Sequence, residues 1–200
     1  MSRHSLQLAY GVWAPIYDPA IRKFSLPLRM ASLAALPPDA RRILVIGVGT
    51  GLDLPLLPPE AECAGVDFSA AMLARARTRA GTAWLVQGDA EQLPFARASF
   101  DAVVLHLILA VVPEAHLAMA EAVRVLRPGG TMLVLDKFLR PGQHAPLRRF
   151  LAPLAARLAT RTDLVFEEIL ASQPGLRKVS DQPAALGGWF RRIHLEKLAP

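Results

Sequence analysis

Three shortages narrow what this sequence can encode: it has one cysteine, no long apolar run and no apolar N-terminal stretch. The single cysteine, Cys63, excludes an internal disulfide and a multi-cysteine metal site, so we expect no metal centre. Because Cys63 lies within a short apolar run, we expect an inert core thiol, which a reducing cytoplasm tolerates. The longest apolar run, residues 107–112, is too short to span a bilayer, and residues 1–10 lack a secretory signal. We therefore expect a cytoplasmic protein that is soluble or lies peripherally on the inner face of the membrane.

The composition fits one globular domain with basic flanks. Of the 200 residues, 52% are hydrophobic and 20% are charged, which allows a full-sized core. Residues 1–42 carry a net charge of +4, residues 43–138 of −3 and residues 139–200 of +5. The basic flanks favour a phosphate-bearing partner such as anionic lipid or nucleic acid, but an arginine-rich composition without any polyanionic partner explains them equally well.

Five short apolar runs alternate with helical or loop segments, a pattern typical of an α/β fold. The runs are residues 43–46, 63–66, 83–86, 102–105 and 131–135. We expect a Rossmann-like seven-stranded, mostly parallel sheet with helices on both faces and an antiparallel edge strand, the last two strands lying near residues 176–180 and 189–195. Helices are predicted at residues 69–80, 113–126, 145–159 and 163–171. Prolines at positions 55, 58 and 59 should limit the helix after the first strand to little more than two turns.

A glycine-rich turn follows the first strand and suggests a nucleotide site. Gly47, Gly49 and Gly51 can take positive φ and let a ligand lie against the backbone. Asp67, twenty positions after Gly47, ends the second apolar run, where its carboxylate can accept hydrogen bonds from both ribose hydroxyls. A dinucleotide fingerprint would need its third glycine at Leu52. The spacing therefore favours S-adenosylmethionine, which has ribose and adenine but no pyrophosphate.

Residues 42–136 resemble the class I S-adenosylmethionine-dependent methyltransferases in four ordered motifs: the glycine loop, residues 66–72, residues 87–95, and the fourth strand with the turn at residues 126–131. The resemblance implies that Asp67 binds ribose, that Phe68 lies beside adenine and that Ser69 caps the next helix. It also implies that Asp89 accepts from the adenine amino group and that the Ala90 amide bonds the ring. The implied cofactor-binding residues are Gly47, Gly49, Gly51, Asp67, Phe68, Met72, Asp89 and Ala90.

The chain departs from the family pattern at one position of the glycine loop. The family usually places Asp or Glu two residues before the first glycine, where it helps to hold the methionine end of the cofactor, and here that residue is Val45. The departure keeps open a protein that binds the cofactor without catalysing methyl transfer.

The resemblance also divides the single domain into three parts: an N-terminal lid or helical segment (1–40), a cofactor-binding core (41–138) and basic substrate-side helices and closing strands (139–200). Tyr10 and Tyr17 lie in the lid segment, where Tyr17 is expected to help catalysis and Tyr10 to contact substrate, although a helix packed on the sheet is the alternative for this segment. His106 follows the fourth strand, where substrate and cofactor meet, so it either assists proton removal or only shapes the pocket.

Within the family, the closest resemblance is to soluble bacterial phosphatidylethanolamine N-methyltransferases, followed by ubiquinone and menaquinone C-methyltransferases. Residues 13–18, the Gly47 loop, the run 103–113 and the basic stretch 139–149 carry it. A phospholipid acceptor would need a phosphate ligand, which Arg140, Arg148 or Arg149 could supply, since guanidinium matches phosphate oxygens bidentately. Each could equally be a solvated helix residue.

The leading hypothesis is N-methylation of phosphatidylethanolamine toward phosphatidylcholine, and the alternative is C- or O-methylation of a quinone or other small apolar acceptor. Nucleic acid is disfavoured as a partner, because aromatic residues make up only 6% of the chain and no Asn-Pro-Pro-aromatic tetrapeptide follows the fourth strand.

Overall fold

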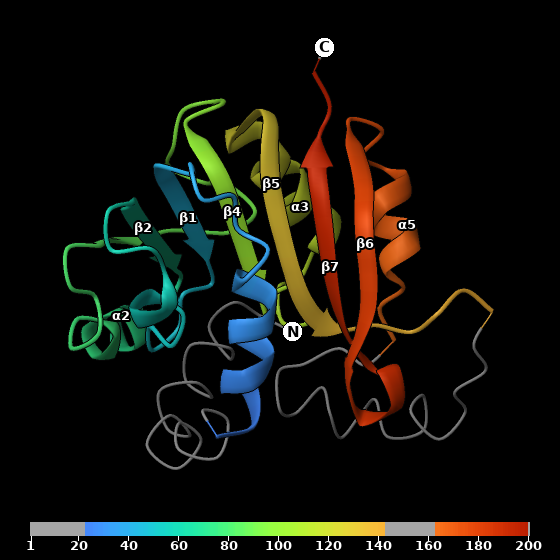
Figure 1. Cartoon of the computed structure of the whole chain (residues 1–200), viewed down its shortest axis with the longest axis horizontal. Helices are drawn as coiled ribbons and strands as arrows, with labels where there is room; N and C mark the ends of the chain where they lie inside the picture. The colour runs from blue at the N-terminus through green and yellow to red at the C-terminus, as the bar shows by residue number, and fades with distance from the viewer. Residues whose placement is uncertain (1–22, 143–162, 200) are drawn as a thin grey trace.

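The computed structural model describes residues 23–142 and 163–199, and these build a seven-stranded twisted sheet (Figure 1). The strands are β1 (Arg42–Ile46), β2 (Glu62–Asp67), β3 (Trp84–Gln87), β4 (Phe100–His106), β5 (Leu126–Lys137), β6 (Leu176–Ala185) and β7 (Phe190–Lys197). Their order across the sheet is β3-β2-β1-β4-β5-β7-β6. All neighbours from β3 to β5 are parallel, whereas β7 runs antiparallel to both β5 and β6. The mostly parallel sheet is therefore confirmed, and its antiparallel strand is inserted one place inside the edge.

The strand order places a crevice beside β1. The chain leaves β1 toward β2 on one side and returns later to β4 on the other, so the connections after β1 and β4 diverge there. In open α/β sheets such a switch point is where ligands bind, at the carboxyl ends of the strands. The glycine loop follows β1 directly, and thus the fold positions it at this crevice.

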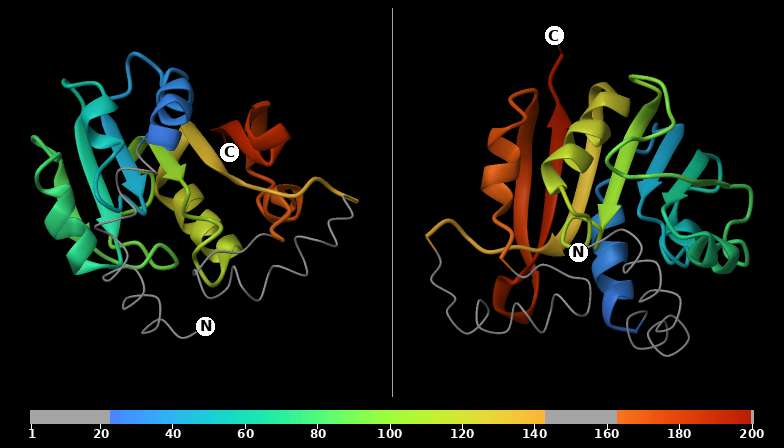
Figure 2. Two further views of the ribbon diagram at one scale, coloured as in Figure 1. Left: turned by 90° about the horizontal axis from the view of Figure 1, so that it is seen from below. Right: turned by 180° about the vertical axis from the view of Figure 1, so that it is seen from behind.

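Helices cover both faces of the sheet, because the strands of its centre are apolar on both sides. Leu44 and Ile46 of β1 join the core under α3 (Ala115–Val125) and α5 (Phe166–Ala171). Ile43 and Val45 point the other way, into a smaller core with the N-terminal helix (residues 23–33), the 3-10 turn η1 (Leu54–Leu56) and α2 (Ala70–Ala76). Figure 2 shows α3 and α5 together on the face away from the N-terminal helix.

Two predicted helices are shorter than expected. The segment after the glycine loop forms only one 3-10 turn, because Pro55 stands in that turn and two further prolines follow at once. Helix α2 ends at Ala76 instead of residue 80. The Thr78 hydroxyl donates to the Arg75 carbonyl at 2.9 Å and so competes with the helical backbone bond, after which i to i+3 bonds close the chain into turns.

The remaining predictions of secondary structure agree to within a few residues. The helix expected at 113–126 spans Ala115–Val125, and the one at 163–171 begins only at Phe166. Both closing strands are longer than predicted, and the helix expected at 145–159 lies outside the described residues. None of the helices in the described ranges has the length and apolar character that a membrane crossing needs.

Candidate functional site

The glycine loop turns sharply at the carboxyl end of β1 and presents open backbone. The amides of Gly47 and Val48 both donate to the Val66 carbonyl, at 2.8 and 3.0 Å, which ties the loop to the end of β2. Gly47 has φ +68° and Gly49 has φ +55°. A Cβ on Gly47 would lie 2.5 Å from Ile108, whereas one on Gly49 would meet only a backbone oxygen 4.0 Å away. Gly47 is therefore required by packing, and Gly49 leaves space in which a ligand can lie against the chain.

We expect Gly47→Ala to destabilise the protein by about 3 kcal/mol, since it combines a left-handed φ with overpacking against Ile108. Gly129→Ala is the matched control: Gly129 has φ +72° but nothing within 4 Å of its Cβ position, so only the backbone strain of about 1 kcal/mol applies. Urea denaturation of both variants measures the difference. Equal losses would contradict the close packing of Gly47 on Ile108.

Asp67 lies at the end of β2 and binds the glycine loop. Its Oδ2 accepts from the Gly49 amide at 2.8 Å, and its Oδ1 accepts from the Ser69 amide at 2.9 Å. Burial raises the pKa of Asp67, an effect that these two amide bonds partly offset. Each carboxylate oxygen has a second lone pair, so the group can still accept bonds from two ribose hydroxyls.

The other predicted cofactor residues follow β2 and β3 at the same edge of the sheet. Ser69 caps α2 as predicted, accepting from the Met72 amide at 3.4 Å. Phe68 is 38% exposed and so has a face available for a flat ring, while Met72 and Ala90 are buried. The Asp89 Oδ1 accepts from the Glu91 amide at 2.9 Å, which fits a turn residue. The hydrogen bond of Asp89 to adenine remains a prediction, as do the contacts of Phe68, Met72 and Ala90 with the cofactor.

His106 is enclosed by the protein. It is 2% exposed, its Nδ1 lies 2.8 Å from Asp53 Oδ1, and its Nε2 lies 3.0 Å from Ser32 Oγ. An ionised carboxylate can only accept, so Nδ1 carries a proton and donates to Asp53. Both ring nitrogens are engaged in hydrogen bonds. This arrangement favours the alternative in which His106 only shapes the pocket over the one in which it assists proton removal.

Sequence reasoning missed the partners of His106. Asp53 is 1% exposed and also forms an ion pair with Arg29 of the N-terminal helix. Burial by itself would raise the pKa of Asp53, but the charges and hydrogen bonds of His106 and Arg29 outweigh it and hold the pKa at about 2. A carboxylate between two leucines in an apolar segment was the available signal.

The backbone directly after His106 is strained. Leu107 has φ +61°, an uncommon conformation for a residue with a branched side chain, and its amide donates to the Leu135 carbonyl at 2.7 Å. The turn sends Ile108 back against Gly47. Such strain concentrates at functional sites, so it supports the carboxyl end of β4 as part of this one.

Most of the predicted catalytic and substrate-binding residues lie outside the described part of the chain: Tyr17 among the catalytic ones, and Tyr10, Arg148 and Arg149 among the substrate-binding ones. Arg140 is described, is exposed and follows β5 at the carboxyl edge of the parallel strands. Cys63 is partly buried and burial raises the pKa of its thiol, which agrees with the inert role expected for it.

The residues at this edge suit S-adenosylmethionine. Space beside Gly49, the spare lone pairs of Asp67 and the half-exposed ring of Phe68 match a ligand that carries ribose and a flat base without a pyrophosphate. The comparison with known proteins agrees, because residues 44–134 match the family described as methyltransferase domain. The chain belongs to the class I S-adenosylmethionine-dependent methyltransferases, and S-adenosylmethionine is its cofactor.

Individual relatives extend the similarity over the whole chain. A phosphatidylethanolamine N-methyltransferase of Cereibacter sphaeroides is 34% identical over 98% of this chain and 100% of its own length. A demethylmenaquinone methyltransferase of Deinococcus radiodurans is 35% identical over 66% of this chain and 60% of its own length. Among solved structures, a Haloferax volcanii methyltransferase in complex with a methyltransferase activator has a TM-score of 0.78 at 17% identity, covering 95% of this chain and 98% of that one.

Proposed function

We propose that the protein methylates the amine of phosphatidylethanolamine on the pathway to phosphatidylcholine. The observation that carries this proposal is the extent of the match: the phosphatidylethanolamine enzyme aligns from end to end, including the flanks that surround the cofactor core. The demethylmenaquinone enzyme aligns over only 66% of this chain. Because one fold can host many activities, a match that includes the segments outside the cofactor core supports an acceptor better than a match limited mostly to the core.

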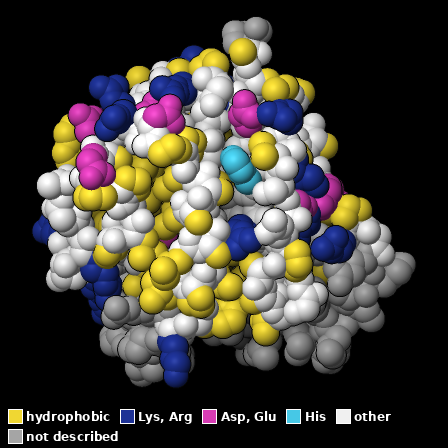
Figure 3. All heavy atoms as spheres, viewed as in Figure 1, with side chains coloured by type: hydrophobic (Ala, Val, Ile, Leu, Met, Phe, Trp, Pro, Cys, Tyr) yellow, Lys and Arg dark blue, Asp and Glu magenta, His cyan; other side chains and the backbone are white. Residues whose placement is uncertain are grey.

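The surface near the crevice supports a lipid acceptor. Phe24 and Met30 of the N-terminal helix and Leu186 of the β6–β7 turn are exposed, and Figure 3 shows hydrophobic side chains gathered over this helix. The Phe24 and Phe190 rings lie 5.4 Å apart, which places this helix against the start of β7. An apolar surface beside basic flanks suits peripheral contact with an anionic membrane.

S-adenosylmethionine supplies an electrophilic methyl group whose sulfur leaves as a neutral thioether, so the protein has mainly to orient the acceptor and exclude water. An amine with an ordinary pKa of about 10 arrives as ammonium and has to lose a proton before it attacks. Apolar surroundings favour that loss, since they penalise the charged form. Of the two residues predicted to assist, His106 is enclosed by Asp53 and Ser32, and therefore Tyr17 is the better candidate to contact the acceptor.

The deciding experiment is radiolabelled methyl transfer from S-adenosylmethionine to three acceptors: phosphatidylethanolamine liposomes, a mixture of quinone precursors, and RNA. We expect label in the phospholipid, recovered as mono-, di- or trimethylated headgroups. Label in the quinones alone would support the alternative, C- or O-methylation of a small apolar acceptor, which the demethylmenaquinone methyltransferase relatives favour. Cofactor binding without transfer to any of them would support a non-catalytic subunit.

Replacing Arg148 and Arg149 together with alanine is expected to lower activity on phosphatidylethanolamine liposomes by about tenfold, because two guanidinium groups would no longer bind the lipid phosphate. Binding of S-adenosylhomocysteine should not change. The control is Arg127→Ala/Arg177→Ala, which removes the same charge near the starts of β5 and β6, at the amino edge of the parallel strands. Equal activity of the two double variants would contradict a phosphate-binding role for Arg148 and Arg149.

A further inference from the structure

The carboxyl edge of the sheet presents binding groups in the same order as the parts of the cofactor. Asp89 follows β3, Asp67 ends β2, the glycine loop follows β1, and His106 ends β4. With adenine at β3 and ribose at β2, the rest of the molecule has to continue across the glycine loop toward β4, since neighbouring strands are only about 4.8 Å apart. The methionine end, which carries one ammonium and one carboxylate, therefore reaches the region between β1 and β4.

In this region the sheet offers no charged group from β1. Val45 is fully buried and pairs in register with Val104 of β4. Both face the smaller core beneath the N-terminal helix. His106 lies two residues beyond Val104 on the same face and bonds Asp53. The ionised side chains on this face thus come from outside the strands, from the segment after the glycine loop and from the N-terminal helix.

Arg29 is the cation of this group. Its Nε donates to Ser25 at 3.2 Å and its Nη1 donates to Asp53. Within the described residues its Nη2 makes no hydrogen bond, although the side chain is only 9% exposed. A mostly buried guanidinium whose Nη2 has no partner among the described residues can donate to an additional acceptor, and a charged acceptor gives the stronger bond.

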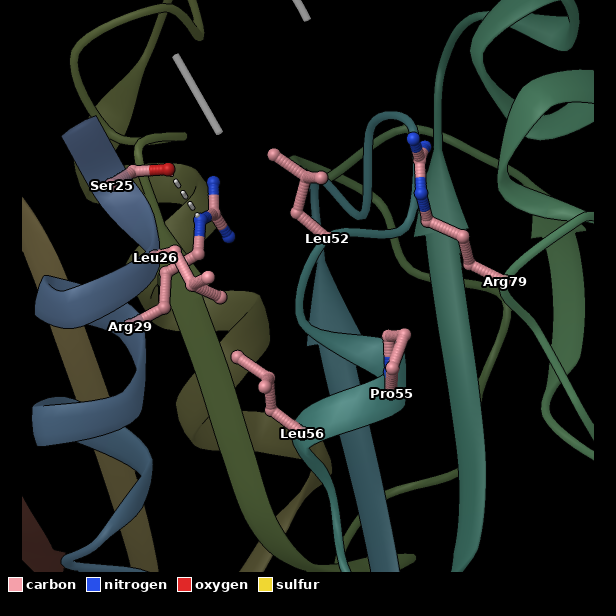
Figure 4. A pocket seen from close by; sticks show the side chains of 7 residues that line it. All are labelled: Ser25, Leu26, Arg29, Leu52, Pro55, Leu56 and Arg79. Carbon is pink, nitrogen blue, oxygen red and sulfur yellow. Dashed lines mark hydrogen bonds between the residues drawn. The ribbon is translucent and has the colours of Figure 1, made fainter. Parts of the chain in front are cut away.

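The same guanidinium lines a pocket next to the glycine loop. The pocket has a volume of about 280 Å³, and its walls come from the N-terminal helix, the segment after the loop and the turn that follows α2. Figure 4 shows Arg29 beside Ser25 and facing Leu52, with Arg79 across the opening. Among the described residues that line it there are two arginines and no carboxylate. The Arg29 charge is paired with Asp53 behind the wall, but its Nη2 can still donate to an anion in the pocket.

We propose that Arg29 binds the carboxylate of the methionine end of the cofactor, with Asp53, His106 and Ser32 as positioning residues that hold the guanidinium in place. Asp53 fixes Arg29 from one side and is itself fixed by His106, whose other nitrogen contacts Ser32. The N-terminal helix supplies both Arg29 and Ser32, so it forms one wall of the cofactor site. This assignment does not depend on which acceptor is methylated.

The test compares two ligands that differ only in the carboxylate: S-adenosylmethionine and decarboxylated S-adenosylmethionine. For the double variant Arg29→Met/Asp53→Asn, we expect the Kd of S-adenosylmethionine to rise by about tenfold to 100-fold, since a charge-assisted bond is lost. The Kd of the decarboxylated ligand should change by less than about threefold. The double variant removes both charges of the pair and so avoids leaving one of them buried and unpaired.

Two further variants keep the comparison interpretable. Arg29→Lys retains the ion pair with Asp53 but loses the planar fork, and it should therefore show a smaller preference for the carboxylate in a fully folded protein. Asp181→Asn weakens the buried ion pair of Arg191, far along the sheet, and should leave the preference as in the parent. The proposal is overturned if binding of both ligands weakens equally, or if the Arg29 variants keep the parent's preference for the ligand with the carboxylate. It is also overturned if Arg79→Met loses this preference while Arg29→Met/Asp53→Asn keeps it.

Discussion

Asp67→Ala is expected to weaken binding of S-adenosylhomocysteine by about 100-fold or more. In the predicted complex the ribose hydroxyls donate two hydrogen bonds to the Asp67 carboxylate, each worth about 1.5 to 3 kcal/mol, and the variant could not accept them. It also leaves the amides of Gly49 and Ser69 without their acceptor, and these amides hold the loop against β2. Isothermal titration calorimetry measures the change directly, without any methyl acceptor.

Asp101→Ala is the matched control for this experiment. The Asp101 carboxylate likewise accepts two backbone amides, those of Arg41 and Arg42 at 2.7 and 2.9 Å, but it does so at the amino end of the sheet. We expect the control to lose stability while its affinity for S-adenosylhomocysteine stays within about twofold of the parent. Unchanged binding in Asp67→Ala would mean that the second motif has been misread.

The sequence was sufficient to predict the features that rest on local pattern. The glycine loop, the Asp67 carboxylate and the Ser69 cap each depend on residue types at short, fixed spacings next to apolar strands, and the structure places all three at the carboxyl edge. The strands were predictable for the same reason, since a run of buried apolar residues is periodic along a few positions of one chain.

The network around His106 could not be predicted from pattern, because its members are far apart in the sequence. Arg29 and Asp53 are separated by 24 residues, and Ser32 and His106 by 74. Nothing local distinguishes Arg29 from the other arginines of this basic chain, and only the fold brings it to a buried carboxylate. The predicted end of α2 was wrong for a different reason, because the Thr78 hydroxyl competes for a helical carbonyl and ends the helix early despite the helical pattern.

Asp53→Asn is expected to lower the free energy of unfolding by about 3 kcal/mol at pH 7. The substitution keeps the volume of the side chain but leaves the Arg29 guanidinium buried without its counter-charge, and breaking a buried ion pair is costly. Guanidinium denaturation of parent and variant measures the loss. Glu62→Gln, which removes a carboxylate from the exposed pair with Arg42, should cost less than about 1 kcal/mol.

The advantage of the parent over Asp53→Asn should depend on pH in a defined direction. The pKa of Asp53 falls from 3.8 to about 2 on folding, so ionisation of this group favours the folded state. Its contribution is fully present above pH 3.8 and is lost as the pH falls through about 2. The two proteins should therefore differ by a constant amount between about pH 5 and 7 and converge below about pH 4. A difference that persists undiminished at the lowest pH would show that packing, and not the charge on Asp53, sets the loss.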